Sequence, residues 1–167
     1  MVYSHKIIVM KAEEIALKES RVKPVVDELN DLLATYHIYY QNLRGCHWNV
    51  KGKSFFTLHA KFEELYTQAL AAIDEIAERV LTLGKPPYST LQKYMEVSEV
   101  KPVETIGMKD TDMVRTVVQN MDKIIGMQRE LLKTTDDAGD DGTNDMVNRL
   151  MQFLEKENWM MRSFLEA

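Results

Sequence analysis

The chain has 167 residues, of which 45% are hydrophobic and 28% are charged, and its formal net charge is −5. This length and composition fit one globular domain with a sizeable core, and they exclude a disordered chain. The acidic balance disfavours a dedicated nucleic-acid binder, which usually has a basic domain. Few Gly (7) and Pro (4) residues favour helices over sheets joined by tight turns.

The sequence predicts a cytoplasmic protein that has no membrane segment. Cys46 is the only cysteine, which excludes an intrachain disulfide, and we expect it to be a buried thiol. The early apolar run Ile7–Met10 is too short for a signal peptide. No stretch approaches the roughly 18 apolar residues of a membrane span.

Residues 1–20 are predicted to form an N-terminal extension, and residues 21–167 to form one helical domain. The first helix is expected to run from about Pro24, a residue suited to the first helical position, to about Val50. A second helix is expected to begin at its cap, Ser54, and to end at Gly84.

The second half of the chain predicts a short helix and two further long ones. The short helix is expected at Thr90–Val97, inside a long link. A third helix, capped by Asp110 or Thr111, is expected to end at the run TTDDAGDDGTND, and a fourth to start at its cap, Thr143. Four long helices with an extra helix in the second link predict an all-α four-helix bundle with a long crossover.

The acidic run between the last two helices has two interpretations. Its acids lie between Asp136 and Asp145. They could form a cation funnel near a pore, because a cleft of one charge sign concentrates counter-ions. The simpler interpretation is a solvated turn whose carboxylates favour the start of the following helix.

Histidine and carboxylate side chains gather on one flank of the second helix. The flank is made of two i,i+4 pairs, His59 with Glu63 and Asp74 with Glu78. His47 continues the apolar stripe of the first helix. Imidazole and carboxylate together are ligands that suit iron, zinc or manganese, so these five residues are the candidate metal ligands. Ordinary core histidines and solvated acids remain the alternative.

The two pairs cannot hold one ion within a single chain. His59 and Asp74 are fifteen residues apart, about 22 Å along a helix. If both pairs serve the same ion, they must come from different subunits. A two-fold axis, as in isologous dimers, would bring the two halves together.

The segment HWNVKGKSFFTLHAKFEELY and the later IDEIAERVLTLG closely resemble the Dps family of mini-ferritins, also called DNA-binding proteins from starved cells. The order of His47, His59, Glu63, Asp74 and Glu78 matches that family's ferroxidase signature. The resemblance covers about residues 22–165 and includes PPYSTLQKY, which looks like the family's short link helix. It implies a ferritin-like four-helix bundle.

The resemblance also implies roles for individual residues. His47, His59 and Glu63 would be catalytic iron ligands from one subunit, and Asp74 and Glu78 would come from the two-fold partner. Glu63 stands where the family often has Asp. Glu keeps the charge of Asp and reaches further, because its side chain has one more methylene. Trp48 would lie beside the centre as a sink for oxidising equivalents, and Glu64 would face the cavity and start mineral growth. Interface packing and a plain solvated acid are their respective alternatives.

The implied protein is a hollow homo-oligomeric shell of twelve subunits with dinuclear iron sites. The implied activity is that of a ferroxidase, which oxidises Fe(II), preferably with hydrogen peroxide, and stores ferric oxide against oxidative damage. The alternative is a nucleoid DNA-binding protein with secondary metal sites. The extension is only slightly basic and the whole chain is acidic, which disfavours strong DNA binding.

Overall fold

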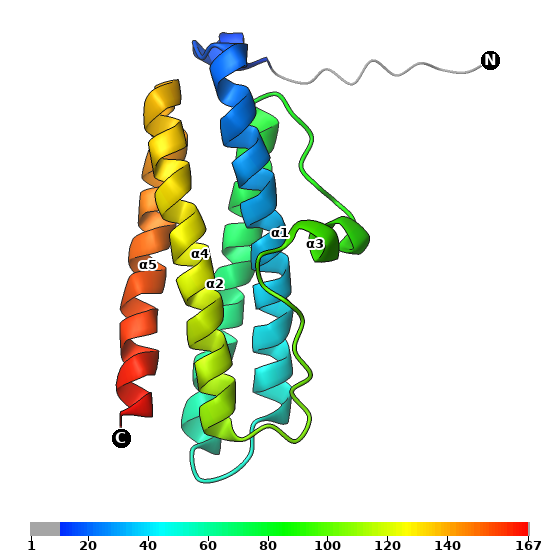
Figure 1. Cartoon of the computed structure of the whole chain (residues 1–167), viewed down its shortest axis with the longest axis vertical. Coiled ribbons are helices and arrows are strands. Elements are labelled where there is room, and N and C mark those ends of the chain that lie inside the picture. Colours follow the sequence, from blue (N-terminus) through cyan, green and yellow to red (C-terminus); the bar gives the residue numbers. More distant parts are fainter. Residues whose placement is uncertain (1–10, 167) are drawn as a thin grey trace, which may run out of the picture.

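Four long helices packed side by side form the body of the protein in the computed structural model, which describes residues 11–166 (Figure 1). The elements are η1 (Ala12–Ile15), α1 (Glu19–Asn49), α2 (Phe55–Thr82), α3 (Leu91–Val97), α4 (Asp110–Ala138) and α5 (Asp141–Leu165). The described residues therefore form an all-α protein with a short extra helix between α2 and α4, as the sequence predicts.

The order of the helices creates two antiparallel hairpins joined by a long crossover. Short connections make α1 antiparallel to α2, and α4 antiparallel to α5 (Figure 1). The segment between α2 and α4 passes along the outside of α1, carries α3 at mid-height, and returns to the opposite end of the bundle. This is a four-helix bundle with one long crossover.

One apolar core runs through all four long helices. It is built from the helical stripes that face the bundle axis. Its largest fully buried side chains are Leu29, Leu32, Leu33, Tyr39, Leu43, Leu58, Phe62, Leu65, Ile76, Leu83, Met113 and Met121. Burying each such side chain contributes roughly 1.5–3 kcal/mol, so the core determines which face of each helix remains free for a site.

The link before α4 is tied to α1 by buried polar contacts. Asn42 donates to the carbonyl of Lys101 at 2.9 Å and accepts from the amide of Val103 at 3.0 Å. At Gly45, an added Cβ would lie 2.9 Å from Oγ1 of Thr105. The crossover therefore approaches α1 closely, and Gly45 is the residue that permits this approach.

Two of the predicted helix starts differ from those observed, and a third agrees. Helix α1 begins at Glu19, so that Pro24 lies inside it. Pro24 has no N–H for the carbonyl of Ser20, but both residues are exposed, so water can bind that carbonyl instead. Ser54 is the N-cap residue of α2, as expected, but its side chain makes no capping hydrogen bond. The N-cap of α4 is Lys109, one residue before the expected Asp110.

The acidic run between the last two helices was predicted as a solvated turn or a cation funnel, and most of it is helical. The break is confined to Gly139, in the left-handed region at φ 70°, and Asp140, so α4 continues to Ala138. The cap of α5 is Asp140, not Thr143. Asp140 is 1% exposed, so at this position the expectation of a solvated acid is wrong.

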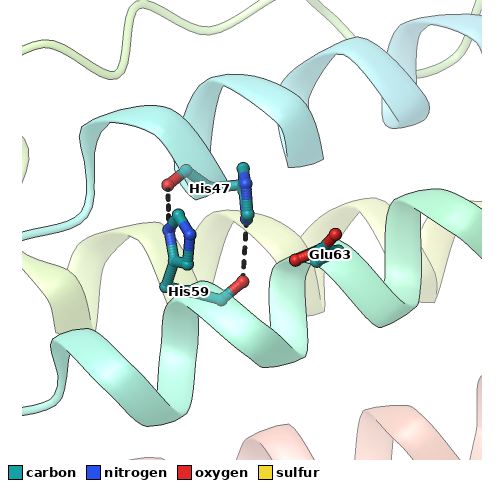
Figure 2. A group of neighbouring side chains, drawn as sticks. All are labelled: His47, His59 and Glu63. Atoms are coloured by element: carbon teal, nitrogen blue, oxygen red, sulfur yellow. Dashed lines mark hydrogen bonds between the residues drawn. The ribbon is translucent and has the colours of Figure 1, made fainter.

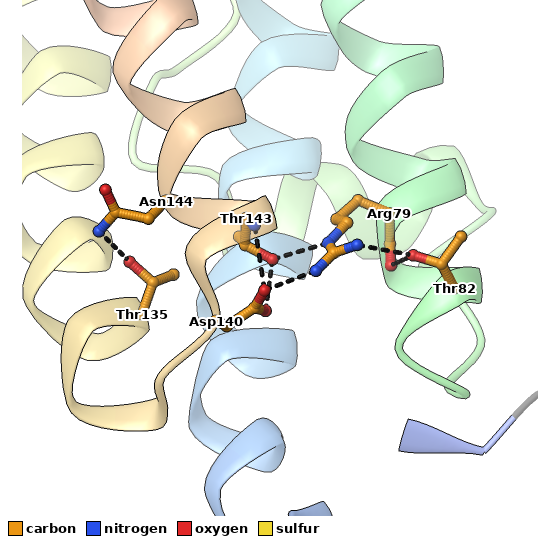
Figure 3. Close-up of polar contacts among 6 residues, drawn as sticks. All are labelled: Arg79, Thr82, Thr135, Asp140, Thr143 and Asn144. Carbon is orange, nitrogen blue, oxygen red and sulfur yellow. Dashed lines mark hydrogen bonds and ion pairs between the residues drawn. The ribbon is translucent and has the colours of Figure 1, made fainter. Parts of the chain in front are cut away.

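Asp140 is buried because it has charged and polar partners (Figure 3). Its carboxylate accepts from the amide of Thr143 at 3.0 Å and from the Thr143 hydroxyl at 2.5 Å. Arg79 of α2 donates to Asp140 at 2.5 Å and to the Thr143 hydroxyl at 2.8 Å. A buried carboxylate requires such partners, and these contacts tie the end of α2 to the start of α5.

Part of the predicted extension packs on the bundle. Ala12 of η1 is 3% exposed and belongs to the main core. The apolar run Ile7–Met10 lies outside the described residues, and the domain boundary after residue 20 stays a prediction. Among residues 11–166, no helix combines the length and apolarity that crossing a membrane requires.

Candidate metal centre

Two histidines from neighbouring helices hold each other in place (Figure 2). His47 is near the end of α1 and His59 is in the first turns of α2. Nδ1 of His47 lies 2.8 Å from the carbonyl oxygen of His59, and Nδ1 of His59 lies 2.9 Å from the carbonyl oxygen of His47. Their rings are stacked, with centroids 3.7 Å apart and planes inclined by 21°.

These contacts define the tautomer of both rings. A carbonyl oxygen can only accept, so Nδ1 must carry the proton in each imidazole. In the neutral ring, Nε2 then keeps its lone pair and is free to bind a metal. A carbonyl partner on the other ring nitrogen is the usual arrangement for a histidine that binds a metal.

Aromatic neighbours complete the packing of the imidazole pair. Phe55 stacks on His59 with a centroid distance of 5.0 Å. Tyr66 meets His47 edge-on at 5.3 Å, and Tyr40 meets Tyr66 edge-on at 6.1 Å. The pKa of Tyr66 is raised by desolvation and by the neighbouring Glu63 carboxylate. Rings packed in this way restrict the rotation of both histidines.

Glu63 completes a set of three ligand atoms. One atom each from His47, His59 and Glu63 lies within 4.8 Å of the others. His47 is 9% exposed, His59 is half-buried and Glu63 is exposed, so the group opens from the core toward the surface. Two imidazole nitrogens and one carboxylate suit a divalent transition metal such as iron or zinc.

The other two candidate ligands lie elsewhere on the same helix. Asp74 and Glu78 are exposed side chains of α2, and they are not part of the group around His59. Along a regular helix, Asp74 lies about 22 Å from His59, which is too far for the two residues of one chain to share an ion. Within one chain, the structure therefore brings together three of the five predicted ligands and leaves two apart.

The remaining sequence candidates have clear environments. Trp48 is 57% exposed, and the guanidinium of Arg44 lies 4.6 Å from its ring centroid. Glu64 is paired at 2.7 Å with Lys61, which also contacts the buried Glu157 at 3.2 Å. Cys46 is buried, and burial raises the pKa of its thiol to about 12, so an inert thiol is the better description.

Sequence reasoning missed the aromatic residues around the histidines. Phe55 lies four residues before His59, and Tyr66 lies three residues after Glu63. Both spacings place the side chains on the same helical flank as the ligands. That signal was available in the sequence, but the same spacing also fits ordinary core packing.

The helix that carries most candidate ligands is fixed to α5 by three ion pairs. Besides the Arg79–Asp140 pair, Lys61 reaches Glu157, and Arg149 pairs with Glu75. These pairs occur near both ends of α2 and in its second half. They hold one side of α2 against the bundle, so that its ligand-bearing flank stays on the outside.

Comparison with known proteins agrees with this fold. Residues 26–167 match the ferritin-like domain family. A DNA protection during starvation protein of Brevibacillus brevis is 40% identical over 150 residues, covering 90% of this chain and 100% of that protein. The Dps crystal structure from Vibrio cholerae O1, described as a member of a broad superfamily of ferritin-like diiron-carboxylate proteins, has a TM-score of 0.89 and 35% identity, covering 93% of this chain and 98% of that one.

A third relative was studied with metal. The structure of Dps from Listeria innocua soaked with zinc has a TM-score of 0.82 and 29% identity, and the match covers 86% of this chain and 97% of that one. The chain thus belongs to the ferritin-like proteins and, among them, to the Dps family.

Proposed function

We propose that this protein is a mini-ferritin that oxidises Fe(II), preferably with hydrogen peroxide, and stores the ferric product. The observation that carries the proposal is the group of His47, His59 and Glu63, whose ligand atoms lie within 4.8 Å of one another. Nε2 of each ring is free for a metal, because Nδ1 is bonded to a carbonyl. Iron is the substrate of this site.

The complete site is dinuclear and is shared between two-fold related subunits. One subunit provides His47, His59 and Glu63, and the second provides its Asp74 and Glu78. The distance of about 22 Å along α2 between the two halves supports this division, since one chain cannot close the site alone. In the family, such dimers build a hollow shell of twelve subunits, and we extend that assembly to this chain.

The ligand set fits the chemistry of a two-electron oxidation. Two ferrous ions lose one electron each, and one hydrogen peroxide takes up both, so that no hydroxyl radical is released. The imidazoles favour the ferrous state, and the carboxylates stabilise the ferric product, because they are hard anionic oxygen donors. Trp48, which follows His47 in the chain and is 57% exposed, is the residue that we assign to intercepting stray one-electron oxidants.

We place the protein in the cytoplasm and attribute protection to the removal of iron and peroxide. The relatives are named for DNA protection during starvation, and either iron chemistry or DNA binding would fit that name. The formal charge of −5 opposes phosphate contacts, which depend on Lys and Arg. DNA binding is therefore the second candidate, and a gel shift at low salt that is lost on deleting residues 1–20 would establish it.

The decisive experiment compares iron oxidation in three proteins. We expect wild-type protein to take up Fe(II) with stoichiometric peroxide in the absence of oxygen, and the iron to co-elute with a shell on a sizing column. The double variant His47→Ala, His59→Ala should keep the shell and lose rapid oxidation. His37→Gln is the matched control, since His37 lies outside the ligand group and should leave the rate unchanged. Undiminished oxidation in the double variant would refute the site.

A further inference from the structure

A cavity of about 160 Å³ lies between α1, α2 and α5, and its lining residues differ from those of the histidine group. Its floor is formed by Tyr36 and Tyr39 of α1, which are 2% and 1% exposed. Its mouth is marked by Gln68 and Arg149, which are both exposed. The cavity therefore leads from the surface of the protein into the interior of the bundle.

The cavity exists because α2 and α5 stay apart. Helix α1 packs closely on α2 and on α4, and α4 packs closely on α5, whereas the backbones of α2 and α5 make few close approaches. At this level α2 carries two alanines, Ala69 and Ala72, whose small side chains do not fill the space between the helices. The long side chain of Arg149 spans the space and pairs with Glu75 of α2. The two helices are thus bridged at the surface and leave a hollow beneath the bridge.

The floor of the cavity carries a buried hydroxyl that is not hydrogen-bonded. Among residues 11–166, the hydroxyl of Tyr39 has no hydrogen-bond partner, whereas the Tyr36 hydroxyl accepts from Nε2 of Gln128 at 3.1 Å. Burial raises the pKa of Tyr39 well above its usual value, so this hydroxyl stays protonated and can donate. A buried donor without a partner is unfavourable, and a ligand that accepts from Tyr39 would supply the missing hydrogen bond.

The size and the lining of the cavity select the chemistry of the ligand. An apolar protein cavity of about 150 Å³ accommodates one benzene ring. The walls here are apolar too, and they are formed by Ala69 and Ala72 on one side and Leu150 and Leu154 on the other. An ordered water molecule needs about two to four polar partners, which such walls do not supply. The best ligand is therefore a single ring that carries one polar atom.

We propose that this cavity binds one monocyclic phenol, with its ring against the apolar walls and its oxygen accepting from the Tyr39 hydroxyl. The hydroxyl group distinguishes phenol from benzene, which fits the same space but leaves Tyr39 without a partner. Gln68 and Arg149 at the mouth provide polar contacts for a substituent on the opposite side of the ring. The proposal does not depend on the iron chemistry proposed above.

The test uses the full metal-free assembly and two ligands, phenol and benzene. Each ligand is titrated into the protein by isothermal calorimetry. We expect wild type to bind one phenol per chain. Tyr39→Phe should weaken phenol binding roughly three- to tenfold, which corresponds to the loss of one hydrogen bond, and it should leave benzene binding unchanged.

Three further variants serve as controls. Ala69→Leu and Ala72→Leu each place a larger side chain in the cavity, and each should abolish the binding of both ligands. Two such variants are used because either one can overpack the bundle, and circular dichroism with a sizing column identifies the one that keeps its fold and assembly. Tyr94→Phe is the matched control for Tyr39→Phe, since Tyr94 belongs to a separate apolar cluster and its removal should leave phenol affinity unchanged.

The outcomes decide both the place and the chemistry of the site. Phenol binding that is lost in a folded cavity-filling variant and weakened in Tyr39→Phe but not in Tyr94→Phe confirms the proposal. No phenol binding by wild type, or unchanged binding in a folded cavity-filling variant, overturns it. An equal loss of phenol and benzene binding in Tyr39→Phe overturns it as well, because the hydroxyl would then have no part in choosing the ligand. Iron oxidation does not enter these measurements, so failure here leaves the proposed function untouched.

Discussion

His47 and His59 each bond through Nδ1 to the other's main-chain carbonyl, at 2.8 and 2.9 Å, so the two rings and the two helix ends form one unit. This reciprocal pair aligns both Nε2 atoms for a metal before any metal arrives. Preorganisation of this kind reduces the cost of binding, because the rotamers are already restricted.

The histidine pair predicts a measurable loss of metal affinity. In His59→Ala, one proposed ligand and the ring that stacks on His47 are both removed. We expect zinc or cobalt affinity to fall at least about tenfold, which corresponds to about 1.4 kcal/mol. Isothermal titration against wild type measures the change, with His37→Gln as the control, and equal affinities would exclude His59 as a ligand.

The buried Asp140 predicts a specific loss of stability. Asp140→Asn keeps the size of the side chain but removes the charge that faces Arg79. We expect the free energy of unfolding to fall by about 1–3 kcal/mol, because a buried group loses its partner. Asp136→Asn changes an exposed acid of the same run and should stay within about 0.5 kcal/mol of wild type in urea unfolding. Similar effects of both substitutions would contradict the buried network.

The close approach at Gly45 predicts that Gly45→Ala destabilises the wild-type protein but stabilises a Thr105→Ala variant. In wild type, Gly45→Ala places a Cβ 2.9 Å from Oγ1 of Thr105, and overpacking should cost about 1–3 kcal/mol. In a Thr105→Ala background the clash is gone, and the same substitution should stabilise by up to about 1 kcal/mol through helix propensity. Gly126→Ala has no atom within 4 Å and serves as a control that should also stabilise. Thermal unfolding is measured for wild type, Gly45→Ala, Thr105→Ala and the double variant. If the effects of the two substitutions simply add, the contact between Gly45 and Thr105 is refuted.

His37 predicts a pH dependence of stability. Its ring stacks on Tyr94 of α3 at 3.9 Å, and burial lowers its pKa from 6.5. The unfolded chain therefore takes up a proton at higher pH than the folded chain. The contribution of the neutral His37 ring to the free energy of unfolding is fully present above pH 6.5, and it is lost as the pH falls through the lowered pKa.

The measurement compares wild type with His37→Phe, which keeps a ring against Tyr94 but cannot be protonated. We expect acidification from about pH 8 to about pH 5 to destabilise wild type more than the variant in urea unfolding. Identical pH slopes in the two proteins would show that His37 is not responsible.

The proposed site shared between two subunits predicts that metal stabilises the assembly. It brings Glu63 beside two carboxylates of a second chain, and like charges repel when no cation lies between them. Zinc should raise the melting temperature, and a chelator should lower it, because a ligand that binds only the assembled state stabilises that state. Asp74→Asn should reduce the repulsion and with it the response to zinc. A zinc response of equal size in this variant would contradict the shared site.

Much of the fold followed from periodicity alone. The apolar stripes predicted all four long helices, because burial of one helical face repeats every 3.6 residues. Helix ends were less predictable. Pro24 and the acidic run allowed several starts and stops, and the choice depended on which groups find buried partners.

The sequence by itself determined the helices, the flank of α2 that carries histidine and acids, and the distance of about 22 Å along α2 that separates His59 from Asp74. Only the tertiary structure decided how the two histidines meet, with each ring bonded to the main-chain carbonyl of the other. His47 and His59 come together because the turn after α1 folds α2 back against it, which no local pattern specifies. Asp140 is buried for the same reason: its partner Arg79 is sixty-one residues away in the chain and is adjacent only after folding.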